Sequence, residues 1–181
     1  MKYFLAIFIV VATSFVSFAS TGDSLPWRQD VELNLNSEAL DDTSAFRALM
    51  IITSDNDFVS KLHSPPESNP KFTTIDKLKI GEQAEIFILF TNPKIDEKSS
   101  VDVKYGVKIT RPNKRVTFNK ELEGISGKLP GSSDSYYLAN ASVRFKAEPT
   151  DPIGEWIIDV TIHDNHSHAS IPLSAKFVLE K

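Results

Sequence analysis

The chain has 181 residues, a formal net charge of −4 and no cysteine. The acidic balance argues against nucleic acid or an anionic membrane surface as the main partner. The lack of cysteine excludes disulfide bonds, thiol catalysis and Cys-ligated zinc, so side-chain packing alone must hold the fold.

The first 19 residues have the pattern of a secretory signal peptide. Lys2 supplies a positive start, residues 4–16 are almost wholly apolar, and Ser17-Phe18-Ala19 is a small-x-small cleavage pattern. An apolar run of about 13 to 16 residues is shorter than the roughly 20 that span a bilayer, and no later segment is apolar enough to cross one. We therefore expect cleavage after Ala19 and a periplasmic or secreted protein without a membrane span. The absence of disulfides favours a bacterial periplasm.

The remaining residues are enough for one hydrophobic core, so we expect a single domain over residues 46–181. Residues 20–45 form an N-terminal segment that either adds an edge strand or stays outside the sheets, and the sequence leaves both alternatives open. Trp27 lies in this segment. Its ring either anchors a partner or is buried under an added edge strand.

Alternation of apolar and polar side chains predicts the strands of the first half. Residues 46–52 read FRALMII, residues 77–80 form a short strand, and residues 84–91 read AEIFILFT, which is apolar on nearly both faces. In residues 101–109 apolar and polar side chains alternate without interruption, as in a strand with one solvent-exposed face. In residues 115–119, Val116 and Phe118 alternate with charged and amide side chains, which predicts another short strand.

The second half begins with the glycine- and serine-containing segment 124–134, for which we expect a flexible surface connection. Three alternating strands follow at residues 141–147, 156–162 and 169–179. Turns rich in proline, glycine and asparagine separate these segments, and no segment shows a convincing helical stripe. The pattern predicts an all-β fold, an antiparallel β-sandwich of about seven to nine strands.

Two segments carry a resemblance to a known group of domains. Residues 109–118 (ITRPNKRVTF) and 149–164 (PTDPIGEWIIDVTIHD), with a final strand that ends FVLEK, resemble bacterial immunoglobulin-like domains. Macroglobulin-like and fibronectin-like sandwiches, and small uncharacterised periplasmic proteins of this kind, are similar over roughly residues 78–181. The resemblance implies an immunoglobulin-like sandwich with a non-catalytic role and no catalytic residues.

Three of the four histidines lie within the six residues HDNHSH, 163–168. Matching inward-facing side chains on the two flanking strands pairs Ile162 with Ala169 and leaves Asn165-His166 as a two-residue loop. His163 and His168 then face each other on the wet side, with Cβ atoms about 4.5–5.5 Å apart.

Two alternatives follow for this hairpin tip. It is either a polar turn that happens to be rich in histidine or a weak site for Zn(II) or Cu(II), with His163 and His168 as ligands and His166 as a third. We expect no other cofactor. Titration of zinc and copper into the protein and into His163→Ala separates the two alternatives.

No catalytic constellation is visible. The chain has no G-x-S-x-G elbow and no phosphate-binding glycine pattern, and Asp96-Glu97 has the character of a solvated surface pair. Tyr136 is expected to face outward if Tyr137 faces the core, so Tyr136 and Trp27 are candidate partner-binding residues. The prediction is a non-enzymatic, exported binding or accessory module that recognises an envelope protein or glycan through loops or an edge strand. The alternative is a periplasmic metal-binding protein.

Overall fold

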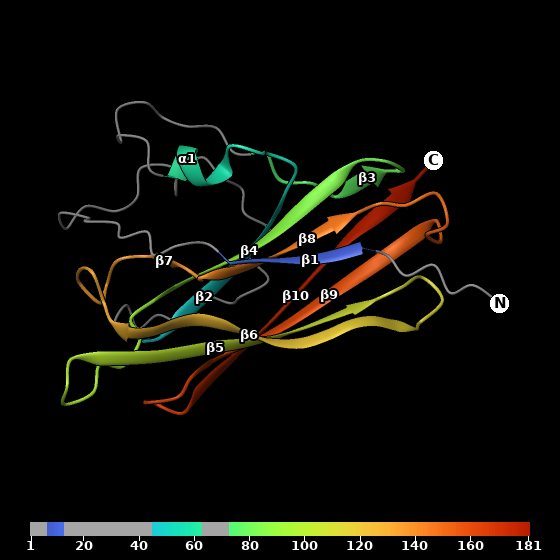
Figure 1. Cartoon of the computed structure of the whole chain (residues 1–181). Helices are drawn as coiled ribbons and strands as arrows, with labels where there is room; N and C mark the ends of the chain where they lie inside the picture. The colour runs from blue at the N-terminus through green and yellow to red at the C-terminus, as the bar shows by residue number, and fades with distance from the viewer. Residues whose placement is uncertain (1–6, 13–44, 63–72) are drawn as a thin grey trace.

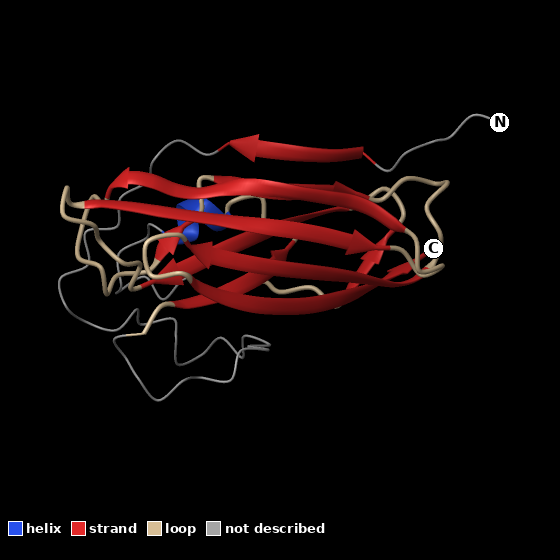
Figure 2. Cartoon of the chain, turned by 90° about the horizontal axis from the view of Figure 1, so that it is seen from below, coloured by secondary structure: helices blue, strands red, loops and turns tan. Residues whose placement is uncertain are grey.

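A computed structural model describes residues 7–12, 45–62 and 73–181 of the chain. Over these ranges nearly all regular structure is β-strand, and the strands stack in two sheets (Figures 1 and 2). The predicted β-sandwich is confirmed. Trp27 and residues 20–44 lie outside the described residues.

In chain order the elements are β1 (Ile7–Ala12), β2 (Arg47–Thr53), α1 (Phe58–Leu62), β3 (Lys77–Lys79), β4 (Gln83–Thr91), β5 (Ser100–Thr110), β6 (Val116–Lys128), β7 (Tyr137–Leu138), β8 (Ala141–Lys146), β9 (Gly154–Asp164) and β10 (Ala169–Glu180).

The first sheet has the order β1-β8-β4-β2, with β7 also paired to β4, and the second has the order β3-β10-β9-β5-β6. Neighbouring strands are antiparallel, except that β3 runs parallel to β10. The prediction of a wholly antiparallel sandwich is therefore wrong at this one edge. Helix α1 is also an addition to the prediction, because five residues are too few to show a helical stripe. Among the described residues, no helix is long and apolar enough to cross a membrane.

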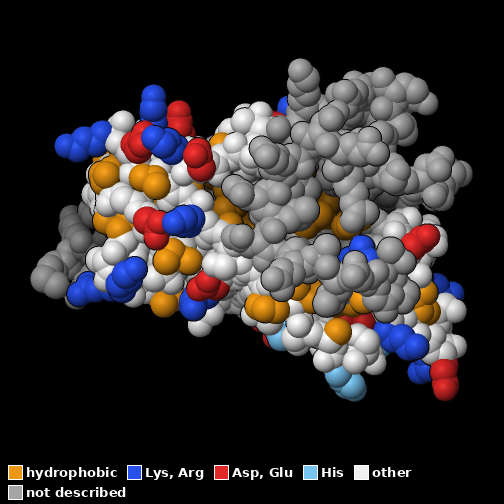
Figure 3. Space-filling view, turned by 180° about the vertical axis from the view of Figure 1, so that it is seen from behind, with side chains coloured by type: hydrophobic (Ala, Val, Ile, Leu, Met, Phe, Trp, Pro, Cys, Tyr) orange, Lys and Arg blue, Asp and Glu red, His pale blue; other side chains and the backbone are white. Residues whose placement is uncertain are grey.

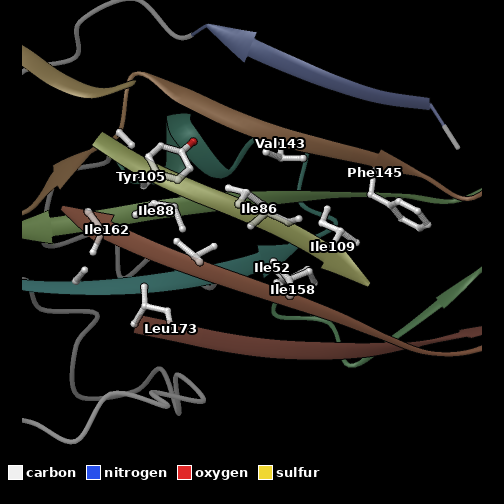
Figure 4. Packing of buried hydrophobic residues seen from close by; sticks show 14 of the residues in the cluster. Ile52, Ile86, Ile88, Tyr105, Ile109, Val143, Phe145, Ile158, Ile162 and Leu173 are labelled. Carbon is white, nitrogen blue, oxygen red and sulfur yellow. The ribbon is translucent and has the colours of Figure 1, made fainter. Parts of the chain in front are cut away.

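The main core lies between the sheets and is built from the inward-facing positions of both. Residues of β5, and those of β9 from Glu155 onward, alternate between buried and accessible, as the sequence predicts. Figure 4 shows side chains from the two layers pointing toward each other across this space. Tyr105 is fully buried among them, and its hydroxyl donates a hydrogen bond to the backbone carbonyl of Ala141. That bond joins β5 of one sheet to β8 of the other.

Strand β4 is apolar on both faces because it separates two clusters. Its inward residues belong to the main core, whereas Phe87 and Leu89 belong to a second cluster on the outer face of the first sheet. In that cluster the ring of Phe58 in α1 stacks on Phe87 with centroids 4.5 Å apart. Since water is excluded from both faces, the strand loses the period-two pattern.

Strand β6 is much longer than the five residues predicted. Two register shifts in its pairing with β5 disturb the alternation, one between Val103 and Lys104 and one between Ile109 and Thr110. A side chain on Gly124 would place its Cβ 2.7 Å from the carbonyl oxygen of Val103, so only glycine fits this bulge. The expectation of a flexible connection over 124–134 is therefore wrong for 124–128. The other shift leaves Val116 exposed while Phe118 is buried.

Strand β1 lies within the segment predicted to be a signal peptide. It pairs with the outer edge of β8 along its whole length. The signal peptide and its cleavage after Ala19 stay predictions.

Candidate binding site at the loop end of the sandwich

The turn between β9 and β10 differs from the predicted one. Ile162 pairs with Ile171, and His163 pairs with Ser170, so the register is shifted by two residues from the predicted pairing. The connection is a four-residue turn over 165–168. A shift of two keeps every inward-facing residue opposite another, so matching of apolar faces cannot distinguish the two registers.

This register separates the histidines that were expected to face each other. The imidazole Nδ1 of His163 lies 2.8 Å from the hydroxyl of Ser170, whereas His168 lies in the turn with φ of 60°. The predicted His163–His168 pair is therefore wrong. Among the described residues, no group of three or more His, Asp or Glu side chains could hold a metal ion. Metal binding at the tip stays a prediction for titration to test.

A buried carboxylate holds the tip in place. Asp164 is 1% exposed, and its Oδ2 accepts hydrogen bonds from the backbone N–H of Lys94 (2.8 Å) and the hydroxyl of Ser167 (2.6 Å). Its Oδ1 accepts from the backbone N–H of His166 at 3.1 Å. Three hydrogen bonds stabilise the carboxylate and tie the turn to the loop that follows β4.

Further hydrogen bonds lock these loops together. The side chain of Asn165 donates to the Asp102 carboxylate at 2.9 Å, and its backbone N–H donates to the Asp102 carbonyl. Nδ1 of His166 lies 3.3 Å from the carbonyl oxygen of Lys94. In the same loop, hydrogen bonds from the backbone N–H groups of Ser100 and Lys98 lower the pKa of Asp96 against the opposing effect of burial. Hydrogen bonds that involve both side chains and backbone groups thus fix these loops.

Asn92 fixes the other side of this loop. It adopts φ of 55°, a conformation that asparagine tolerates better than most residues. Its backbone N–H donates to the carbonyl of Ser133, and its amide nitrogen donates to the carbonyl of Ala45. The hydroxyl of Thr91 donates to the carbonyl of Asp134 at 2.9 Å. Loops from three parts of the chain therefore meet at one end of the sandwich.

These loops line a hollow of about 510 Å³ that is open to solvent, which we call the loop-end hollow. Its walls are both apolar and polar, and Ile95 at 41% exposure is one of the few large apolar side chains left open to solvent. This end lies away from the C-terminus, at the β9–β10 turn (Figure 1), and Figure 3 shows histidines near apolar side chains at the margin of one face. The lining residues are Phe46, Asn92, Pro93, Lys94, Ile95, Ser133, Asp164, Ser167 and Ala169.

Of the candidate partner-binding residues, only Tyr136 can be located. Tyr137 is fully buried in the main core, and its hydroxyl donates to the Ser132 carbonyl at 2.6 Å. Tyr136 lies outside that core, as expected, but it packs against the second cluster and is half-buried. It is therefore a poorer contact residue than a fully exposed aromatic.

The sequence did not point to Asp164 or Ile95 as site residues. Asp164 occupies an inward position of an alternating strand, and an acidic residue at such a position is a detectable signal, because buried charge must be satisfied. Ile95 follows Asn92-Pro93 in a polar turn, where an isolated isoleucine is unusual but not diagnostic. The convergence of loops around both has no sequence signature, since it depends on tertiary structure.

Comparison with known proteins identifies no family. No family model matches the chain, and no curated protein matches it. Among solved structures it is similar to the CARDB domain of a Pyrococcus furiosus protein, solved with two metal ions, at 10% identity and a TM-score of 0.40. That match covers 79% of this chain and all of the domain.

Two further similarities have the same character. The C-terminal domain of wzt matches at 14% identity and a TM-score of 0.39, covering 75% of this chain and 74% of that one. A family 123 glycoside hydrolase from Clostridium perfringens matches at 10% identity and a TM-score of 0.37 over 75% of this chain. This chain spans only 28% of the length of that enzyme. These similarities are distant and identify no family for this chain.

Proposed function

We propose that the protein is an exported, non-catalytic binding module of the bacterial envelope that recognises a protein partner through the loop-end hollow. The observation that carries this proposal is the open hollow of about 510 Å³ with Ile95 exposed at its wall. A volume of this order accommodates a large side chain or a short loop of a partner. Burial of the exposed isoleucine in such a contact removes apolar surface from water, which favours binding.

The rigidity of the loops supports recognition. Because Asp164, Asn165 and Asn92 tie the loops to one another and to the strands, little conformational entropy remains to be lost when a partner binds. The polar side chains at the hollow make hydrogen bonds that hold its loops in place. Asp164 accepts three hydrogen bonds, one of them from the hydroxyl of Ser167. These engagements suit a binding surface better than an acid–base site.

We expect Ile95→Asp to weaken partner capture by at least about tenfold, which corresponds to about 1.4 kcal/mol of binding free energy. The measurement is a quantitative pull-down from envelope extract, with the recovered partner identified and then titrated in purified form. Two matched controls are Val116→Asp and Ile153→Asp, because these residues are 53% and 45% exposed, like Ile95, but do not line the hollow. Both controls should capture the partner as the wild type does.

Equal capture by Ile95→Asp and the wild type would overturn the hollow as the contact site. Recovery of a glycan that competes with the protein partner would assign the hollow to sugar recognition instead. The zinc and copper titration described above tests the metal-binding alternative separately, since it uses His163→Ala, and His163 does not line the hollow.

A further inference from the structure

We propose that the edge of β8 that pairs with β1 becomes a strand acceptor once the predicted signal peptide is removed. It then binds an extended apolar segment of a partner protein antiparallel to β8. The proposal concerns a different surface from the loop-end hollow and does not depend on it. It depends on the expected cleavage after Ala19.

The first observation is the pairing of β1 with β8. The apolar hexapeptide Ile7–Ala12, IFIVVA, forms a continuous antiparallel ladder with Ala141–Lys146 over six residues and without a register shift. In Figures 1 and 2 this strand lies along the outer side of the first sheet. Residues 7–12 fall within the predicted signal peptide. Their removal would leave the six-residue edge of β8 unpaired.

The second observation is that β8 lacks the features that protect the other sheet edges in the described part of the chain. Strand β3 has only three residues, with Lys77 and Lys79 exposed, and β6 carries two register shifts. The β2 edge is met by an isolated bridge from Thr53 to Thr74. Short length, charge and bulges block edge-to-edge pairing, and β8 has neither a proline nor a bulge in its pairing with β4.

The charged residues of β8 leave the edge accessible. Nη2 of Arg144 lies 2.7 Å from Oε1 of Glu85 on β4, so this side chain is held toward the neighbouring strand and not across the edge. Lys146 is exposed at the end of the strand. The middle of the edge is therefore open to a hydrogen-bonding strand.

The ladder also shows which backbone groups of β8 face a partner. The N–H of Ala147 donates to Glu82, and its carbonyl accepts from Gly81, so the backbone of Ala147 points toward β4. Backbone groups alternate in direction along a strand. Those of Ser142, Arg144 and Lys146 therefore point toward the open edge.

The occupant should be an apolar strand. Ala141, Val143 and Phe145 are buried at the margin of the main core. Paired residues of antiparallel strands share a face, so a partner gains most from apolar side chains opposite these three positions. The partner is thus an extended segment with apolar residues at alternate positions, and the full-length chain supplies such a segment itself in IFIVVA.

The test uses the protein purified after export, with its N-terminus determined by intact mass. The probe is a fluorescent IFIVVA peptide with lysines added at both ends for solubility, and binding is followed by anisotropy. We expect saturable binding. In the register of the β1–β8 pairing, Ile9 and Val11 lie opposite Arg144 and Ser142. N-methylation of both Ile9 and Val11 should therefore weaken binding by about tenfold or more, since it removes edge-directed hydrogen bonds.

The matched control is the same peptide N-methylated at Phe8 and Val10, whose N–H groups point away from β8 in this register. It should bind within about twofold of the parent peptide, because no ladder hydrogen bond is lost. The proposal would be overturned if both methylated peptides bound equally weakly, or if neither bound more weakly than the parent peptide. Either result indicates nonspecific hydrophobic association and not strand addition. An exported protein that retains residues 7–12 would overturn it as well.

Two protein variants separate this proposal from the function at the hollow. Ser142→Pro removes one edge-directed N–H and should lose peptide binding while it keeps partner capture at the hollow. Ile95→Asp should keep peptide binding and lose partner capture at the hollow. If the exported protein is a dimer that the peptide dissociates, the occupant of the edge is a second copy of this chain, and the proposed partner is wrong.

Discussion

Replacement of Trp156 by alanine is expected to lower the free energy of unfolding by about 3–5 kcal/mol, the usual cost of deleting a fully buried tryptophan. Trp156 has no exposed surface. Its ring stacks on Phe177 with an interplanar angle of 5° and lies 5.0 Å from the ring of Phe145. Because Phe145 belongs to the opposite sheet, loss of the indole opens a cavity between the layers.

Polar contacts add to this effect. The indole N–H of Trp156 donates to the carbonyl of Pro152 at 3.1 Å, and the guanidinium carbon of Arg111 lies 5.5 Å from the centre of the Trp156 ring. Nη2 of Arg111 also lies 3.6 Å from Oδ1 of Asp151. Removal of the ring therefore takes away a cation–π contact as well as packing, which together stabilise the turn before β9.

Chemical denaturation of the wild type and the variants measures the free energy of unfolding and so tests the prediction. Trp156→Phe should lose less than Trp156→Ala, because it keeps an aromatic ring in the stack with Phe177. Val116→Ala is the matched control and should change stability by less than about 0.5 kcal/mol, since Val116 is 53% exposed. A loss below about 1 kcal/mol for Trp156→Ala would mean that this ring does not bridge the two sheets.

Asp164→Asn is expected to lower the free energy of unfolding by about 2–3 kcal/mol and to loosen the loop-end hollow. Asparagine has the same shape, but one of its two terminal atoms becomes an N–H₂ donor. The carboxylate of Asp164 receives donors at both oxygens, so the new amide must face at least one N–H or O–H. A buried donor left without an acceptor costs about 1–3 kcal/mol, and loss of the charge weakens the remaining bonds.

Two measurements check this prediction. Chemical denaturation gives the stability, and backbone amide chemical shifts report on the N–H groups of Lys94 and His166, which should both change. Ser167→Ala is the control, since it removes one hydrogen bond and leaves both backbone contacts; it should cost no more than about 1.5 kcal/mol. Unchanged amide shifts at Lys94 in Asp164→Asn would show that the carboxylate does not hold the two loops together.

The layers of the fold were predictable because alternation reports directly on which side of a strand meets water. Strands β5 and β9 follow the pattern along their length, and β4 departs from it for a physical reason, its burial between two clusters. Strand β6 was cut short in the prediction because the bulges at its pairing with β5 break the alternation. The alternating pattern reports which side chains are buried. It fails where a bulge shifts the register of the backbone.

The candidate site was far less predictable. Apolar matching on one face of a hairpin allows registers that differ by two residues, and the structure adopts the one that places His163 opposite Ser170. The four-residue turn is compatible with the bonds that Asp164 accepts from His166 and Ser167, within the turn itself. The bond from Lys94, 70 residues away in sequence, depends on tertiary structure and leaves no local pattern.

Site-specific photocrosslinking in cells that produce the protein tests whether the loop-end hollow contacts a partner protein. A photoreactive phenylalanine analogue in place of Ile95 should form a covalent adduct with a distinct partner protein on irradiation. The same analogue in place of Val116 should form none, because Val116 is more exposed than Ile95 (53% against 41%) but does not line the hollow. An adduct of the same yield at position 116, or no adduct at position 95, would show that the loop-end hollow is not the contact site.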